Sequence, residues 1–338
     1  MDLWADAVLA VVLAVLIDRF VGEPPNRIHP LRWMGNMLDA IDRRISDRSS
    51  RMNVLWGLLS YLLVFAVFCG IALCMTSLMR IGVSGYSAAL GEALWIAATA
   101  WLFKMTFAVF SFRRHCRPIC EDLEAGDIEG ADAKVQMIVS RDTRGMDAEH
   151  VASSCCETVS ENLVDSVYSP ALYFGILGLP GAFMFRCCNL MDAMWGYLDD
   201  RYSLLGRFPA RFDDVLGFIT SRISPYFIAL AGLLLGMDWR AAVPAARVEH
   251  AKTPSPNSGW SMTAAAAVLG ISMEKRGVYV MGSGPLPSAD DVGRCCRLIE
   301  TASVLFILTV CLILFVSIGV HVQVLLEDAI FGFWGSIL

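Results

Sequence analysis

Two stretches of this chain are long and apolar enough to cross a lipid bilayer and contain no charged residue. They are residues 54–79 and 301–326. A helix that spans the hydrocarbon core needs about 20 mostly apolar residues. Hydrophobic residues make up 56% of the chain and charged residues 18%, whereas soluble domains average roughly 45–50% and 25%. The sequence therefore predicts an all-α integral membrane protein.

Four more apolar segments make the predicted protein polytopic. Residues 3–17 lack the basic region and the cleavage site of a signal peptide, so we expect an anchor. Residues 85–112 are long enough to span but carry Glu92 and Lys104. Prolines, glycines or an arginine interrupt residues 167–185 and 215–237, and irregular backbone is tolerated at membrane depth when protein buries it. We expect one membrane-embedded domain over residues 1–338, a helical bundle in which these two segments are re-entrant or buried broken helices.

The basic residues indicate the orientation. Most lysines and arginines lie in the polar segments 18–53, 113–166, 186–214 and 238–300. Because cytoplasmic loops are enriched in Lys and Arg, these segments are expected on the cytoplasmic side of the cell membrane, in a multi-pass topology. The net charge of −6 argues against nucleic acid as a partner.

Eleven cysteines include three adjacent pairs, at positions 155–156, 187–188 and 295–296. Neighbouring cysteines bridge each other poorly, and neither a C-x-x-C motif nor Cys/His zinc spacing is present. We expect these thiols to act as small buried hydrophobes in a reducing compartment.

Glu157, Glu161 and Asp165 form an acidic ladder at i, i+4 and i+8, with Asn162 beside it. On a helix this spacing places the three carboxylates on one face, where like charges repel. A hard divalent cation such as Mg²⁺ would offset that repulsion. The alternative is a solvated acidic face with no ligand.

Three other polar motifs accompany the ladder. The first is the proline-rich turn after Asp18, which leads to His29, and the second pairs Asn189 with Asp192 at i, i+3. The third is a proline-fixed turn that offers hydroxyl, amide and backbone N–H groups to an anion; it contains Ser255, Asn257 and Gly259. Each motif alone could be a turn or capping device, but four on one membrane face indicate a composite site. The chain has no P-loop, no G-x-S-x-G elbow and no H-E-x-x-H helix, which disfavours the corresponding hydrolase classes.

Taken in order, these motifs resemble the CbiB/CobD family, the adenosylcobinamide-phosphate synthases of cobalamin biosynthesis. The resemblance runs from about Asp18 to Gly282 and includes Arg141 leading into the ladder. Two departures stand out. Many members have a proline and a glutamate where this chain has Ser261 and Met262, and Ala193 replaces a small polar residue.

The resemblance implies an ATP-dependent amide ligation. The carboxyl group of adenosylcobyric acid would be joined to the amine of (R)-1-aminopropan-2-ol or of its O-phosphate. ATP and Mg²⁺ are the implied cofactors, and the lipid bilayer and later enzymes of the pathway are the implied partners.

The roles that follow for individual residues are expectations of the same kind. The metal ligands are expected to be Glu157, Glu161, Asn162 and Asp165, with Asp192 as a further ligand or orienting group. Phosphates are expected at Arg141, Arg201, Arg211 and Lys252, and nucleotide contacts at Ser255, Asn257, Gly259, Asp18 and His29. His250 would accept the proton of the attacking ammonium because imidazole titrates near neutral pH, with His29 and solvent as alternatives.

A membrane transporter of a corrinoid or organic anion is the main rival. Transporters place ionisable groups inside broken spans, and Glu92, Lys104 and Arg222 fit that description. A membrane scaffold is a third possibility. The densest polar motifs lie between spans and no internal repeat is visible, which favours the enzyme.

Overall fold

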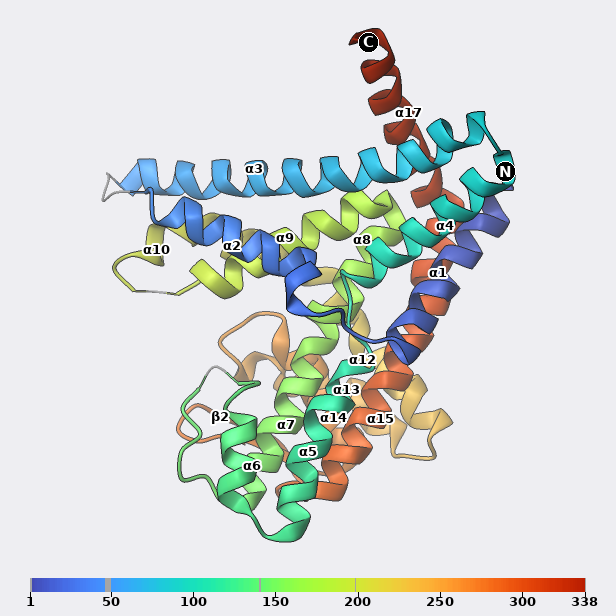
Figure 1. Cartoon of the computed structure of the whole chain (residues 1–338). Coiled ribbons are helices and arrows are strands. Elements are labelled where there is room, and N and C mark those ends of the chain that lie inside the picture. The colour runs from blue at the N-terminus through green and yellow to red at the C-terminus, as the bar shows by residue number, and fades with distance from the viewer. Residues whose placement is uncertain (1, 46–49, 140, 198, 338) are drawn as a thin grey trace. The chain divides into compact units, whose positions relative to one another are not determined.

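The computed structural model describes residues 2–45, 50–139, 141–197 and 199–337, and over these residues the chain is helical apart from a short β-hairpin (Figure 1). The predicted helical fold is thus confirmed. The chain forms two compact units, each assembled from segments far apart in sequence. The first contains Met1–Ala108, Ser169–Leu216 and Ile307–Leu338, and the second contains Val109–Tyr168 and Gly217–Phe306.

The first unit holds most of the apolar helices. Its α-helices are α1 (Leu3–Phe20), α2 (Pro30–Asp42), α3 (Ser50–Ser77), α4 (Ala88–Lys104), α8 (Ser169–Leu177), α9 (Leu179–Trp195), α10 (Tyr202–Leu205), α11 (Arg207–Leu216), α16 (Leu312–Leu314) and α17 (Val320–Ile337). Short 3₁₀ or π segments join them at η1 (Asn26–Ile28), η2 (Leu78–Gly82), η3 (Val83–Gly85), η7 (Ile307–Cys311) and η8 (Phe315–Gly319). A stack of three aromatic rings forms part of its core: Phe174 lies 3.7 Å from Phe103 and 4.2 Å from Phe315, centroid to centroid.

Two continuous helical stretches, Arg51–Gly85 and Ala289–Gly332, are long and apolar enough to cross a membrane. They contain the two charge-free runs from which a membrane protein was predicted. A third candidate arises if α11 and the next helix, α12 (Phe218–Leu234), form one broken span. Helices α1 and α4, 18 and 17 residues long, correspond to the predicted spans 3–17 and 85–112, which stay predictions.

The broken segment 167–185 turns back on itself. Gly178, with φ of 68°, separates α8 from α9. The rings of Tyr173 and Phe185 lie 6.0 Å apart, whereas twelve residues of straight helix would separate them by about 18 Å. A Cβ atom on Gly181 would lie 2.0 Å from the Tyr173 carbonyl oxygen, so only glycine permits this approach. The chain reversal that a re-entrant segment requires is therefore present.

The second unit carries the acidic ladder and the hairpin. Its elements are α5 (Ser111–Ala125), α6 (Ile128–Val135), α7 (Ala148–Leu163), η4 (Val164–Tyr168), α12 (Phe218–Leu234), η5 (Trp239–Ala241), α13 (Ala242–Glu249), η6 (His250–Lys252), α14 (Ser258–Leu269), β1 (Ser272–Lys275), β2 (Tyr279–Gly282) and α15 (Ala289–Phe306). The strands are antiparallel, with Met273 opposite Met281. Sequence periodicity did not reveal them because four residues are too few for a visible alternation.

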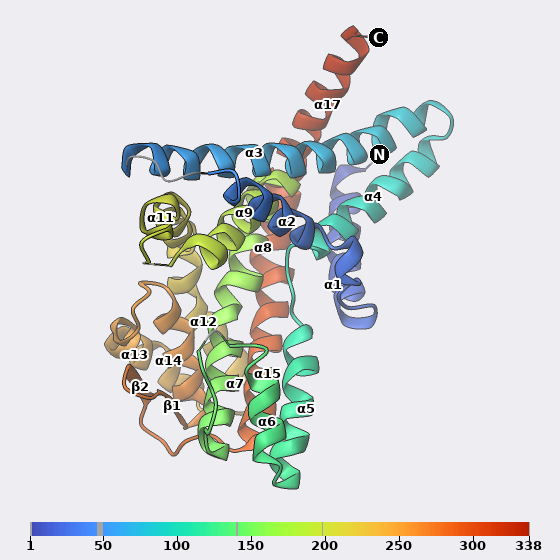
Figure 2. The same ribbon diagram turned by 60° about the vertical axis from the view of Figure 1, so that its left-hand side comes forward.

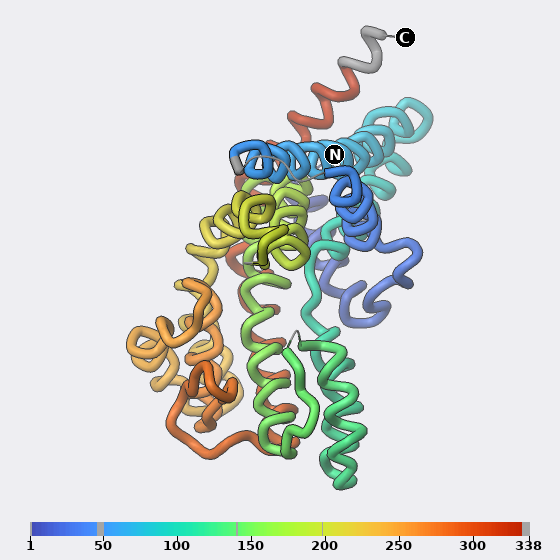
Figure 3. Tube along the Cα trace, turned by 90° about the vertical axis from the view of Figure 1, so that its left-hand side faces the viewer, coloured from blue at the N-terminus to red at the C-terminus, as the bar shows by residue number. Residues whose placement is uncertain are grey.

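Helices α5, α7 and α15 pack alongside one another in this unit (Figures 2 and 3). Their contact surface includes the buried thiols of Cys155, Cys156, Cys295 and Cys296. All eleven cysteines of the chain are free, and nine are buried, in agreement with the expectation that they act as small hydrophobes.

Candidate functional site

The acidic ladder lies on α7 and on the segment that follows it. Asp147 begins the helix, because its Oδ1 accepts the backbone N–H of His150 at 2.9 Å. The α-helix ends at Leu163 and continues as the π-helical segment η4, which holds Asp165. Such wide turns interrupt the i, i+4 register and are frequent at functional sites. Glu157 and Glu161 thus share an α-helical face as predicted, while Asp165 follows a different helical period.

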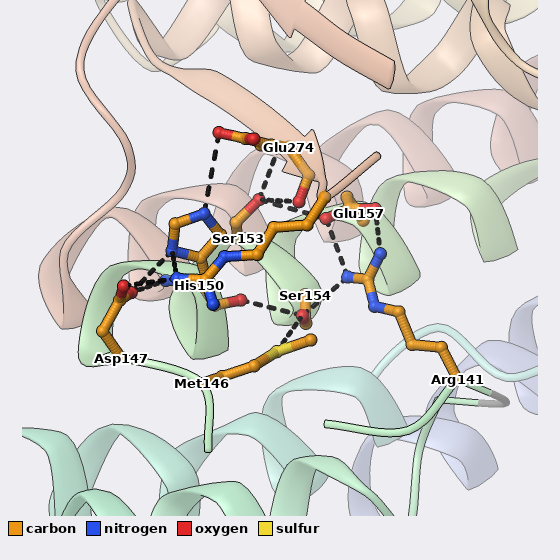
Figure 4. A network of polar contacts seen from close by, with 9 residues as sticks. Arg141, Met146, Asp147, His150, Ser153, Ser154, Glu157 and Glu274 are labelled. Atoms are coloured by element: carbon orange, nitrogen blue, oxygen red, sulfur yellow. Dashed lines mark hydrogen bonds and ion pairs between the residues drawn. The ribbon is translucent and has the colours of Figure 1, made fainter. Parts of the chain in front are cut away.

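Glu157 is the centre of a satisfied polar network (Figure 4). Its two carboxylate oxygens accept hydrogen bonds from Arg141 Nη1 and Nη2 at 2.9 and 2.8 Å. Ser153 donates at 3.0 Å, and Tyr279 from strand β2 donates at 2.8 Å. The Glu157 side chain is almost fully buried. A buried carboxylate with four donors is strongly held, which leaves little capacity for a further ligand.

Glu161, one helical turn further on, contrasts with Glu157. Its side chain is accessible to solvent and has no hydrogen-bond partner among the described residues. Desolvation by the surrounding protein, and then the charge of Glu157, raise the pKa of its carboxyl above the ordinary value. Glu161 is therefore the acid of the ladder that is open to a ligand.

The remaining ladder residues are less open. Asn162 Nδ2 donates to the Thr158 carbonyl at 2.9 Å and its Oδ1 accepts from Ser166 at 3.2 Å, so its amide is engaged along its own helix. Asp165 is half-buried. Over the described part of the chain, no three His, Cys, Asp or Glu side chains are grouped closely enough to enclose a metal. Mg²⁺ often uses only one or two protein carboxylates, so Glu161 with one further carboxylate would be enough to hold it.

His250 lies at the end of α13 and has a defined tautomer. Its Nδ1 lies 3.0 Å from the Ala246 carbonyl oxygen, which only accepts, so Nδ1 carries the proton. Nε2 then presents a lone pair, and no partner for it is found among the described residues. The ring stacks on Trp260, with centroids 4.0 Å apart. An imidazole held in this state is suited to accept a proton.

The polar groups of the turn at the start of α14 mainly make contacts within the protein. The Ser255 hydroxyl accepts the N–H of Asn257 at 3.2 Å. A Cβ atom on Gly259 would lie 2.0 Å from the His250 carbonyl oxygen, so this glycine permits close packing against the histidine segment. Asn257 Oδ1 accepts from Arg222 at 2.8 Å, which ties α12 to the turn. Arg222 fits a transport site by its sequence position, and its contact with Asn257 leaves no pattern in the sequence.

Lys252 is also committed to local contacts. Its ammonium group donates to the Val280 carbonyl at 3.0 Å and pairs with Glu249 at 3.0 Å. Glu249 in turn accepts the N–H of Gly282 at 2.9 Å. These bonds attach the hairpin to the segment that carries His250.

In the first unit, Asp18 and His29 belong to a charged cluster around Lys104. The buried ammonium of Lys104 lies 3.1 Å from Asp18 Oδ1 and 2.5 Å from Glu23 Oε1. Glu23 Oε2 is 3.1 Å from His29 Nε2, while His29 Nδ1 accepts the Leu31 N–H at 3.2 Å as the N-cap of α2. Both ring nitrogens of His29 are thus occupied. Of the two histidines considered as proton acceptors, His250 has the free nitrogen.

Asp192 and Asn189 lie near the end of α9. Burial, and then the charge of Asp214, raise the pKa of Asp192 to about 6. Asn189 Oδ1 accepts from Arg186 at 3.0 Å. Asp192 is therefore a partly desolvated acid like Glu161, but in the other unit.

The two arginines expected at phosphates in this unit differ. Arg201 pairs with Asp42 at 2.8 Å. Arg211 is exposed and has no acidic partner among the described residues. It lines an open groove together with Arg207, Phe208 and Phe212.

The predicted residues thus separate into two sets. Asp18, His29, Asp192, Arg201 and Arg211 lie in the first unit; Arg141, Glu157, Glu161, Asn162, Asp165, His250, Lys252, Ser255, Asn257 and Gly259 lie in the second. Their convergence into one site stays a prediction. Sequence reasoning missed Tyr279, Ser153 and Glu23. Only Glu23 gave a signal, since it lies within the proline-rich turn singled out in the sequence.

Comparisons with known proteins agree with the motif order. The family model described as CobD/Cbib protein matches residues 11–326. A protein named probable cobalamin biosynthesis protein CobD from Methanothermobacter thermautotrophicus is 39% identical over 280 residues, 81% of this chain and 86% of that protein. Proteins with the same name from Methanocaldococcus jannaschii and Thermococcus kodakarensis are 34% and 35% identical, over 82% and 86% of this chain and 89% and 90% of their own lengths. No solved structure matches the chain.

Proposed function

The chain belongs to the CobD/Cbib family, and we propose that it forms adenosylcobinamide phosphate by an ATP-dependent amide ligation. The substrates are adenosylcobyric acid and (R)-1-aminopropan-2-ol or its O-phosphate. The observation that carries the proposal is the open carboxylate of Glu161 beside the closed Arg141–Glu157 pair. It supplies an accessible carboxylate with no hydrogen-bond partner among the described residues, one helical turn from an acid that is already paired.

The chemistry requires activation of a carboxylate. An amine does not displace oxide from a carboxylate at neutral pH, so the substrate carboxylate first attacks the terminal phosphorus of ATP. This step forms an acyl phosphate and releases ADP. The amine then attacks the acyl carbon, the C–O bond to phosphate breaks, and the amine loses a proton as the amide forms.

Both steps concentrate negative charge, which fixed donors and cations stabilise. In the proposed site Glu161 and Asp165 would hold Mg²⁺, which would neutralise charge at the phosphates. Glu157 does not compete, because Arg141 and Tyr279 occupy its oxygens. Its role is to fix α7 against the hairpin, and thus to hold the backbone from which Glu161 projects.

His250 is the proposed acceptor of the amine proton. Its Nδ1–H is held by the Ala246 carbonyl, and stacking on Trp260 fixes the ring plane. The Nε2 lone pair is therefore oriented before the substrate binds. General-base assistance of this kind contributes about 10²–10⁴ in rate.

The rival transport function was based partly on two cationic side chains within apolar segments, and the contacts of both weaken it. Lys104 is neutralised by Asp18 and Glu23, and Arg222 donates to Asn257. Both groups therefore have structural partners.

The test is direct. Purified protein in detergent is incubated with adenosylcobyric acid, aminopropanol O-phosphate and Mg-ATP, and products are followed by mass spectrometry. The proposal predicts a product that is heavier by the amine minus one water, formed in step with nucleotide release. Uptake of a corrinoid into vesicles without any such product would favour the transporter instead.

A further inference from the structure

Helix α11 presents two arginines on one exposed face. Arg207 and Arg211 are spaced i, i+4, and neither has an acidic partner among the described residues. Other cations assigned to phosphates are paired: Arg141 with Glu157, Arg201 with Asp42 and Lys252 with Glu249. Two like charges one helical turn apart repel each other. An anion between the two guanidinium groups would remove that repulsion.

An apolar groove lies beside these arginines. It has a volume of about 470 Å³ and is lined by Val54 of α3 and by Phe208, Phe212 and Val215 of α11, in addition to the two arginines. Figure 2 shows α11 beside one end of α3. The rings of Phe208 and Phe212 are 5.4 Å apart, and each lies 5.6 Å from Tyr61, so the groove wall is well supported.

The position of the groove along α3 also bears on its ligand. Val54 lies one turn inside the candidate membrane-spanning stretch that starts at Arg51. The end of an apolar span is where lipid headgroups meet protein, and arginines at this level interact with anionic lipids. Val215, at the other end of the arginine face, is 66% exposed although it is apolar. A hydrocarbon chain would cover it.

We propose that this groove binds one anionic phospholipid. The phosphate lies between Arg207 and Arg211, where each guanidinium donates charge-assisted hydrogen bonds. One acyl chain runs along Val54, Phe212 and Val215. A nucleotide or free phosphate would neutralise the arginines but leave the apolar wall in water, so the groove favours a lipid over the nucleotide contact that family resemblance suggested for Arg211. The proposal does not depend on the ligation reaction.

The experiment uses the full-length protein in a nonionic detergent, with bound lipid counted by native mass spectrometry. Phosphatidylglycerol, phosphatidylcholine with the same acyl chains, inorganic phosphate and ATP are titrated separately. Wild-type protein is expected to bind phosphatidylglycerol at one site and phosphatidylcholine much more weakly. R207Q/R211Q is expected to weaken phosphatidylglycerol binding by about tenfold or more, because it removes the charge-assisted hydrogen bonds to the phosphate.

Two further variants make the test specific. R240Q is the matched control, because Arg240 is also exposed and lines an apolar groove, of about 330 Å³, but has no second arginine among the residues of that groove. It should bind phosphatidylglycerol like the wild type. V215D places a charge at the exposed position where the acyl chain is proposed to lie. It should therefore weaken phosphatidylglycerol binding. Unchanged binding in R207Q/R211Q, an equal loss in R240Q, or displacement of the lipid by ATP or phosphate would each overturn the proposal.

Discussion

Arg141 and Glu157 form a two-pronged ion pair inside the second unit, with N–O distances of 2.9 and 2.8 Å and both side chains largely buried. The pair joins the loop before α7 to the helix itself, and Tyr279 extends it to the hairpin. Two groups with opposite charge and matched geometry neutralise each other here. The neighbouring Glu161 is left as the open acid, and the proposed chemistry rests on this difference.

Removal of Arg141 should destabilise the fold. R141M leaves the Glu157 carboxylate buried without its cation, and loss of one partner of a buried pair costs about 3–5 kcal/mol. Thermal unfolding in detergent measures the effect. The double variant R141M/E157Q should recover most of the loss, because it buries no unpaired charge. A double variant no more stable than R141M would show that the ion pair is not what stabilises this region.

Replacement of Glu161 should slow turnover strongly without unfolding the protein. E161Q keeps the shape of the side chain but removes the charge that holds the cation, so ligation should slow by about 10²–10⁴. E149Q is the matched control, because Glu149 is an exposed acid in the first turn of the same helix. A folded E161Q protein that ligates as fast as E149Q would exclude Glu161 from the reaction.

Asp192 should make stability dependent on pH. Its folded-state pKa is raised from 3.8 to about 6 by burial and by Asp214. Between these values the folded protein binds a proton that the unfolded chain has lost, so the free energy of unfolding falls as pH rises from about 4 to above 6. D192N has no carboxyl group to ionise at this position, so its free energy of unfolding should not fall in the same way. It should match the wild type near pH 4 and melt at a higher temperature at pH 7.5, by about 2–4 °C per kcal/mol removed.

The control for that measurement is D200N, which changes an exposed acid five residues beyond Trp195, the last residue of α9. Its melting temperature should follow the wild type at every pH. A constant difference between D192N and wild type across the whole range would contradict the assigned ionisation.

Imidazole added to the solution should partly replace His250 as the proton acceptor. H250A removes the proposed proton acceptor and should slow ligation by about 10²–10⁴, with partial rescue by added imidazole. H29A should instead lower thermal stability by about 1 kcal/mol through loss of the α2 N-cap, and imidazole should not restore its stability. Loss of activity in H250A that imidazole cannot rescue at any concentration, in a folded protein, would count against the assignment.

The long apolar runs allowed the two candidate membrane-spanning stretches to be predicted from sequence, because a span needs a length and composition that soluble domains lack. Helix α7 could also be predicted, since its acids repeat at helical spacing. What the ladder does not reveal is which acid is open. Arg141 folds back from 16 positions upstream and Tyr279 arrives from 122 positions downstream, and such long-range pairings leave no local pattern.

Lys104 illustrates the same point. A lysine in an apolar run suggested a transport site, yet its partners Asp18 and Glu23 lie more than 80 residues earlier. The turn that contains those acids was singled out for its prolines, and the cation that neutralises it could be identified only in three dimensions.

The transfer of oxygen from the carboxylate tests the proposed reaction most directly. Adenosylcobyric acid labelled with oxygen-18 in the reacting carboxyl group is incubated with the protein, the amine substrate and Mg-ATP, and the released phosphate is analysed by mass spectrometry. Activation as an acyl phosphate predicts one labelled oxygen in the inorganic phosphate for each amide formed. Amide formation with no label in any phosphate product would contradict the mechanism.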